Sequence, residues 1–181
     1  MIIIPINDEL IPELEVFCKK AKELGYVNNS SLKLMRYDWC KENGEFYCAI
    51  KGDDIVAVAG CHTLPEFSPN AWRIMFRGCE LPGASPYKGL NKGDWNSITQ
   101  RDFIPEFINY IPSKELYIST NISNEHSGKA LRNHKIMNIL ARQKDAYIID
   151  VCDMMLNNVH QTIWKLNIEQ YLSRRSKLNV V

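Results

Sequence analysis

Residues 76–95 read FRGCELPGASPYKGLNKGDW and contain four of the nine glycines, at positions 78, 83, 89 and 93. Glycine lets a backbone approach a bound anion closely, and such a stretch before a helix can cradle phosphate groups. The same residues also suit a long irregular connection with turns at Pro82-Gly83 and Lys92-Gly93. The elements on either side help to choose between these two interpretations.

A strand precedes this stretch and a helix follows it. Residues 71–79, AWRIMFRGC, alternate large apolar side chains with others, which predicts a strand. Phe103, Phe107 and Ile111 recur at helical spacing and predict a helix within 98–111, which Pro105 must start or kink. The glycine-bearing stretch therefore has the place of a strand-to-helix loop.

The N-terminal part predicts a strand, two helices and a hairpin. The β-branched run at residues 2–6 predicts the strand, and apolar positions at steps of three and four predict a helix over 10–24. A second helix is expected after Ser30, ending near Gly44. Residues 46–50 and 55–61 predict a hairpin, whose second arm, IVAVAGC, has small residues that indicate a close approach.

The C-terminal part continues the alternation of strands and helices. We expect a strand at 116–122, a helix at 127–143, strands at 146–154 and 162–168, and a basic irregular tail from about residue 171. The order β-α-α-β-β-β-α-β-α-β-β predicts an α/β (α+β) fold with a mixed sheet. A length of 181 residues predicts a single domain.

Composition excludes several classes of protein. Hydrophobic residues make up 45% and charged residues 24%, which is typical of a folded globular chain. The 22 basic and 21 acidic residues give a net charge of +1, which disfavours nucleic acid and anionic lipid as partners. Without an apolar run of about 20 residues or a basic leader, the sequence predicts no membrane association and a cytoplasmic location.

Cysteine and histidine spacing predicts no metal site. The six cysteines include no C-x-x-C pair and lie mostly in apolar segments, which favours buried, reduced thiols. The four histidines include no pair at the i, i+4 spacing of a helical metal site.

The element order, with a glycine-bearing loop between the third central strand and the next helix, resembles the GNAT superfamily of acetyl-CoA-dependent N-acetyltransferases over residues 2–168. More narrowly, stretches such as FRGCELPG at 76–83 and YISTNISN at 117–124 are similar to divergent GNAT-like proteins of tailed bacteriophages, for which the location would be the host cytoplasm. The resemblance implies transfer of an acetyl or acyl group from acetyl-CoA, the cosubstrate, to an amine on a small molecule or a protein. A homodimer is compatible with it. The alternative is a binding or interaction protein that kept the fold and lost the reaction.

The resemblance also implies a cofactor site. The family signature, Gln or Arg followed by x-x-Gly-x-Gly or Ala, is matched best by ELPGAS, in which Glu80 and Ser85 replace the usual residues. An Asn follows the fifth strand of the family, and the pantetheine arm would lie between the strands ending at 78–79 and 120–121. The implied cofactor-binding residues are Cys79, Leu81, Gly83, Ala84, Ser85, Lys88, Gly89, Asn121 and Asn124.

Catalytic residues are less well specified. Glu80, His62 and Glu66 are candidates for the general base because each is expected near a strand end. The position that usually holds a proton-donating Tyr, seven residues after Asn124, holds Leu131, which removes the standard general acid. Asn121 and Asn124 are equally suited to capping the following helix.

Overall fold

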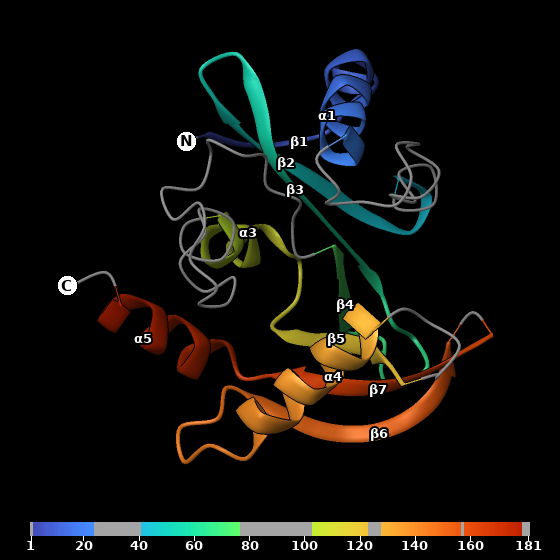
Figure 1. Ribbon diagram of the computed structural model, residues 1–181, viewed down its shortest axis with the longest axis vertical. Coiled ribbons are helices and arrows are strands. Elements are labelled where there is room, and N and C mark those ends of the chain that lie inside the picture. The colour runs from blue at the N-terminus through green and yellow to red at the C-terminus, as the bar shows by residue number, and fades with distance from the viewer. Residues whose placement is uncertain (1, 24–40, 77–102, 123–127, 157, 179–181) are drawn as a thin grey trace. The chain divides into compact units, whose positions relative to one another are not determined.

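The computed structural model describes residues 2–23, 41–76, 103–122, 128–156 and 158–178. The strands are β1 (Ile2–Pro5), β2 (Gly44–Lys51), β3 (Asp54–Thr63), β4 (Ala71–Phe76), β5 (Glu115–Asn121), β6 (Ile148–Leu156) and β7 (Val159–Leu166). The helices are η1 (Asp8–Leu10), α1 (Ile11–Glu23), α3 (Ile104–Tyr110), α4 (Gly128–Ala141) and α5 (Ile168–Leu178), all labelled or coloured in Figure 1.

The chain forms two compact units. The first comprises residues 1–62 and 75–112, and the second comprises 63–74 and 113–181. The strand order is β1-β2-β3-β4-β5-β7-β6. Parallel and antiparallel pairs both occur, which confirms the predicted α/β class with a mixed sheet. The single-domain organisation stays a prediction.

In the first unit, β1, β2 and β3 form an antiparallel meander. Gly52 has a φ of 64° in the tight turn between β2 and β3, a conformation that glycine adopts without strain. A Cβ atom on Gly44 would lie 1.9 Å from the carbonyl oxygen of Cys61, so the first residue of β2 must be glycine for the strands to pair. The predicted hairpin is confirmed.

Helix α1 covers one face of this meander. Leu14 and Phe17 pack with Phe46, Cys48 and Val58 in a buried apolar cluster. These residues are adjacent because helix positions three apart and strand positions two apart each share a face. Burial raises the pKa of the Cys48 thiol to about 11, so this cysteine stays protonated, as expected for an interior thiol.

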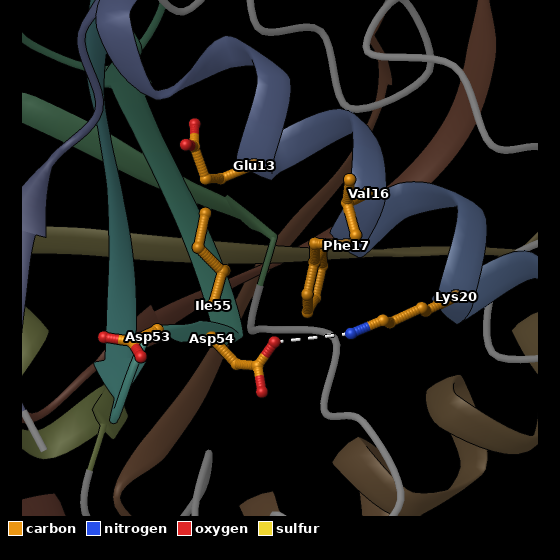
Figure 2. A pocket seen from close by; sticks show the side chains of 7 residues that line it. All are labelled: Glu13, Val16, Phe17, Lys20, Asp53, Asp54 and Ile55. Carbon is orange, nitrogen blue, oxygen red and sulfur yellow. Dashed lines mark hydrogen bonds and ion pairs between the residues drawn. The ribbon is translucent and has the colours of Figure 1, made fainter.

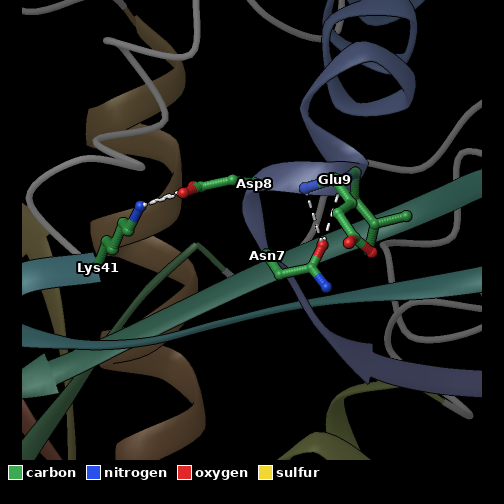
Figure 3. A network of polar contacts seen from close by, with 5 residues as sticks. Asn7, Asp8, Glu9 and Lys41 are labelled. Atoms are coloured by element: carbon green, nitrogen blue, oxygen red, sulfur yellow. Dashed lines mark hydrogen bonds and ion pairs between the residues drawn. The ribbon is translucent and has the colours of Figure 1, made fainter.

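The entry into α1 is held by polar contacts (Figure 3). The Asn7 side-chain oxygen accepts hydrogen bonds from the backbone N–H groups of Glu9 and Leu10, at 3.1 and 3.2 Å, and so caps η1. The Lys41 ammonium lies 2.6 and 2.7 Å from the two carboxylate oxygens of Asp8. The cap and the ion pair tie the start of the helix to the residues before β2.

Helix α3 packs on the opposite face of the meander, where Tyr47 meets it. The Tyr47 ring lies 5.5 Å from the rings of both Phe107 and Tyr110. Ala59, directly opposite Tyr47 in the register, is one of the small residues that indicated a close approach. Pro105 occupies the first turn of α3 and starts the helix instead of kinking it.

In the second unit, β4 pairs in parallel with β5, and β5 and β6 pair antiparallel with β7. The β6–β7 turn contains Asn158 with a φ of 60°, which asparagine tolerates better than most residues. Strand β7 therefore begins at Val159, earlier than the Thr162 that the sequence predicted. Helix α4 contacts both β5 and β6, as Figure 1 shows.

The irregular tail expected from about residue 171 was wrong, because α5 runs from Ile168 to Leu178. The Asn167 side-chain oxygen accepts a hydrogen bond from the Gln170 backbone N–H at 3.1 Å, which caps the helix start. Tyr171 is buried, with its ring 5.4 Å from that of Tyr147. Packing and the cap order a segment whose basic composition resembled that of a frayed end.

Some predictions lie outside the described residues. They include most of the helix expected between Ser30 and Gly44, although residues 41–43 are helical, and the loop at 77–102. Among the described residues, Cys18, Cys48 and Cys61 are buried, and Cys152 is exposed. No helix in the described part of the chain is long and apolar enough to cross a membrane.

The cluster beneath α1 predicts that substitutions at neighbouring positions of this helix differ greatly in their effect on the free energy of unfolding. Phe17→Ala should lower the free energy of unfolding by about 4 kcal/mol, because it leaves a cavity in a closed apolar cluster. Val16→Ala, on the exposed side of the same helix, is the matched control and should cost less than about 1 kcal/mol. Urea unfolding checks both, and equal losses would contradict the packing described for α1.

Candidate functional site

The structure describes three of the residues predicted from the sequence to form the site. Asn121 is the last residue of β5. His62 is buried near the end of β3 in the first unit, whereas Glu66 is exposed in the loop after β3, in the second unit. The others lie outside the described residues: Cys79, Glu80, Leu81, Gly83, Ala84, Ser85, Lys88, Gly89 and Asn124.

The parallel pair β4–β5 gives the second unit its clearest feature. Within the second unit, the register between these strands runs from Ala71–Glu115 to Ile74–Ile118, and β5 continues to Asn121. On its other edge, β7 pairs with β5 along the whole of Ser119–Asn121. The carboxyl end of β5 thus extends beyond its register with β4, and in a mixed sheet such strand ends are common positions for ligand sites.

A charged side chain crosses this end of the sheet. One terminal guanidinium nitrogen of Arg73, on β4, donates to the Ser119 hydroxyl on β5 and, at 2.9 Å, to the Gln161 side-chain oxygen on β7. The Gln161 amide nitrogen donates in turn to the Leu156 carbonyl oxygen at 3.3 Å. Hydrogen bonds to an ionised donor are stronger than neutral ones, so the trio holds three strands together where the β4–β5 register ends.

A second polar group lies at the start of β5. The Glu115 carboxylate accepts hydrogen bonds from the Ser68 hydroxyl at 2.7 Å and the Tyr117 hydroxyl at 2.8 Å. These bonds, with the nearby Lys165 ammonium, lower the pKa of Glu115. Burial, followed by the contact with Glu115, raises the pKa of Tyr117 to about 12.

These shifts determine what the pair can do. Near neutral pH, Glu115 is ionised and Tyr117 is protonated. The pKa of each group is shifted further from neutral pH, and so away from the range that is useful for proton transfer. The Phe67 ring also packs on Tyr117, with ring centroids 4.8 Å apart. Glu115 and Tyr117 therefore fasten the loop after β3 to the sheet, and a role as general base or acid is not supported for either.

Sequence reasoning missed Arg73, Ser119 and Gln161. The alternation of residues 71–79 predicts that Arg73 lies on the face opposite Trp72 and Ile74, and a charge inside a short apolar strand is the available signal. Ser119 and Gln161 gave no such signal, because strand register alone brings them to Arg73.

The first unit contains a shallow pocket between α1 and the β2–β3 turn (Figure 2). Its volume is about 110 Å³, and Phe17 and Ile55 contribute apolar walls. The Lys20 ammonium lies 3.3 Å from an Asp54 carboxylate oxygen at its rim. None of the residues predicted to form the site lines this pocket, which is too small for a nucleotide cofactor.

Solved structures resemble this chain over nearly its whole length. A GNAT-family protein from Desulfovibrio desulfuricans matches 92% of this chain and 98% of its own, with a TM-score of 0.54 and 8% identity. An aminoglycoside 6′-N-acetyltransferase complexed with coenzyme A matches 93% of this chain and 97% of its own, with a TM-score of 0.51 and 12% identity. The chain has the GNAT fold.

Sequence comparison adds nothing to this assignment. No protein-family model matches the chain, and no curated protein matches it in sequence. A Streptococcus mutans protein with 14% identity and a TM-score of 0.50 matches 93% of this chain and 99% of its own. The GNAT fold inferred from element order is therefore confirmed by structure, at identities that carry no information about activity.

Within this GNAT fold, the candidate site is the carboxyl end of β5 and the residues that continue from it toward α4. Asn121 belongs to this end, and the Arg73, Ser119 and Gln161 trio lies beside it in the register. Among the described residues, no group of three or more His, Cys, Asp or Glu is placed to hold a metal ion.

The lowered pKa of Glu115 predicts a specific dependence of stability on pH. Above the ordinary value of 4.5, the carboxylate is ionised in both states and its hydrogen bonds stabilise the fold. As pH falls through 4.5 and then through the lower folded value, that stabilisation is lost. Glu115→Gln should therefore lose less stability than the wild type between pH 7 and pH 3.

Urea unfolding at the two pH values measures this difference. The matched control is Glu66→Gln, which changes an exposed carboxylate in the loop that Glu115 fastens and should behave as the wild type does. If the free energy of unfolding falls by the same amount on acidification in the wild type and in Glu115→Gln, the hydrogen bonds to Glu115 do not stabilise its ionised form.

Proposed function

We propose that the protein transfers an acetyl or other acyl group from acetyl-CoA to an amine. The observation that carries this proposal is the end of the β4–β5 register at Ile74–Ile118, with β5 continuing to Asn121, in a chain with the GNAT fold. Backbone groups along an extended strand alternate between its two edges, and β7 pairs with only one edge of this segment. The other edge offers hydrogen bonds to the amide groups of a pantetheine arm.

The proposed cofactor site joins this strand end to the glycine-bearing loop. Backbone N–H groups of a glycine-rich loop can converge on a pyrophosphate, and lysine can offset its charge. The residues proposed to bind acetyl-CoA remain those expected from the sequence: Cys79, Leu81, Gly83, Ala84, Ser85, Lys88, Gly89, Asn121 and Asn124.

The proposed reaction is direct attack. The amine nitrogen attacks the thioester carbonyl carbon, the carbon–sulfur bond breaks, and CoA leaves as a thiolate that takes up a proton. Glu80, His62 and Glu66 are the candidate bases for the proton lost by the amine. With Leu131 at the position of the usual acid, the rate would depend mainly on positioning of the two substrates.

Binding of acetyl-CoA gives the most direct test. Millimolar acetyl-CoA should raise the thermal unfolding midpoint, because a ligand that binds only the folded state stabilises it. ATP at the same concentration is the control for adenine nucleotides in general and should give a smaller shift. Absence of any shift with acetyl-CoA would remove the basis of the proposal.

Glycine substitutions test the part assigned to the loop. Gly83→Val should weaken acetyl-CoA binding by about tenfold or more, because a branched side chain keeps the backbone from the anion. Gly93→Val changes a glycine of the same loop that is not among the proposed contacts, and it should bind acetyl-CoA as the wild type does. Calorimetric titration of both variants measures the dissociation constants, and equal weakening would contradict the assignment.

The second candidate function is binding without catalysis. Leu131 favours it, because the family's usual proton donor is absent from the position that the resemblance assigns to it. A protein of this kind would bind acetyl-CoA and acetylate none of a panel of small amines and lysine peptides. Release of free CoA thiol in the presence of an amine would instead identify an enzyme.

A further inference from the structure

The hydroxyl of Thr120 joins three elements of the second unit. Thr120 is buried at the next-to-last position of β5. The Trp164 indole N–H, on β7, donates to its oxygen at 2.8 Å. The Nδ1 atom of His134, on α4, lies 3.2 Å from the same oxygen, and the rings of His134 and Trp164 pack with centroids 5.9 Å apart.

Asn138 determines which nitrogen of His134 carries the proton. The Asn138 side-chain nitrogen lies 3.2 Å from the His134 carbonyl oxygen and 2.9 Å from His134 Nε2. A carbonyl oxygen only accepts hydrogen bonds, so the end of the Asn138 amide that faces it is the nitrogen, and this nitrogen also donates to Nε2. Nδ1 therefore carries the ring proton and donates to Thr120, whose oxygen accepts from both His134 and Trp164.

This arrangement holds both ends of the connection between β5 and α4. Asn121 follows Thr120 directly, and Asn124 lies between it and the start of α4 at Gly128. His134 is six residues after Gly128, about 9 Å along the helix at 1.5 Å per residue. The hydrogen bond that His134 donates to Thr120 thus sets the distance between the end of β5 and the beginning of α4.

We infer that Thr120 is a positioning residue for acetyl-CoA, an inference that rests on the proposed function. Its hydroxyl is engaged by Trp164 and His134, so it acts through β7 and α4 on β5, the strand that carries Asn121. Without it, the buried Trp164 N–H and the half-buried His134 N–H lose their acceptor, and α4 moves to recover one. A displacement of about 1 Å at the helix start is enough to weaken contacts with a bound cofactor.

The chain offers a closely matched control for this inference. Thr162 lies directly opposite Thr120 in the β5–β7 register and is also buried. Its hydroxyl donates to the Asp153 carboxylate at 2.6 Å, within the β6–β7 hairpin. Thr120→Val and Thr162→Val therefore each remove one buried hydroxyl from neighbouring strands, but only the first breaks the connection to α4.

The experiment is calorimetric titration of wild type and variants with acetyl-CoA, after circular dichroism and thermal unfolding confirm that each is folded. Thr120→Val should raise the dissociation constant about tenfold, Thr120→Ser should restore it to within about twofold, and Thr162→Val should leave it unchanged. His134→Phe keeps a ring against Trp164 and removes Nδ1. Combined with Thr120→Val, it should weaken binding by less than the product of the two single effects, because both variants break one hydrogen bond.

Each outcome has a distinct meaning. If the wild type binds and Thr120→Val binds equally well, Thr120 does not position the cofactor and the proposed function stands. If Thr120→Val and Thr162→Val weaken binding equally, the effect is general destabilisation and the inference is overturned. If the folded wild type does not bind acetyl-CoA, the proposed function fails, and the inference falls with it.

Discussion

Strand β3 is buried at every position from Ile55 to His62, and the rest of the first unit follows from that constraint. Successive residues of a strand point to opposite faces, so a strand buried throughout needs cover on both sides. Helix α1 covers one face of the β2–β3 hairpin through Phe17, and on the other face Phe107 of α3 packs on Tyr47 of β2. Small residues along β3 allow a large ring such as Tyr47 to fit beside it.

The second unit is organised by hydrogen bonds as much as by apolar packing. Arg73, Ser119 and Gln161 join three strands near the end of the β4–β5 register, and Thr120 joins β5 and β7 to α4 on the other side of the sheet. Polar groups in such positions are costly unless every partner is in place. Their occurrence at one end of β5 distinguishes that end from the remainder of the sheet, and it is the end to which the proposed cofactor site belongs.

Most of the fold could be predicted because periodicity is a local signal. The first strand, the helix beginning near residue 11, the β2–β3 hairpin and β5 were all expected where they occur. Helix α5 was not predicted, because the basic composition of the segment suggested a frayed end. The hydrogen bond between Asn167 and Gln170 and the burial of Tyr171 stabilise the helix, and the burial depends on tertiary packing. The prediction of the candidate site can be compared with the structure only in part, because nine of its predicted residues lie outside the described residues. The observed polar trio could not be predicted from local patterns, because its three residues come from three separate strands.

The sequence by itself determined the class of fold, the order of most elements and the place of the glycine-bearing stretch FRGCELPGASPYKGLNKGDW between a strand and a helix. Those are properties of neighbouring residues, read from spacing and composition. Only the tertiary structure decided that the β4–β5 register ends before β5 does, and that Thr120, His134 and Trp164 share one oxygen. Register and long-range hydrogen bonds depend on how distant segments pack, and no local pattern encodes that packing.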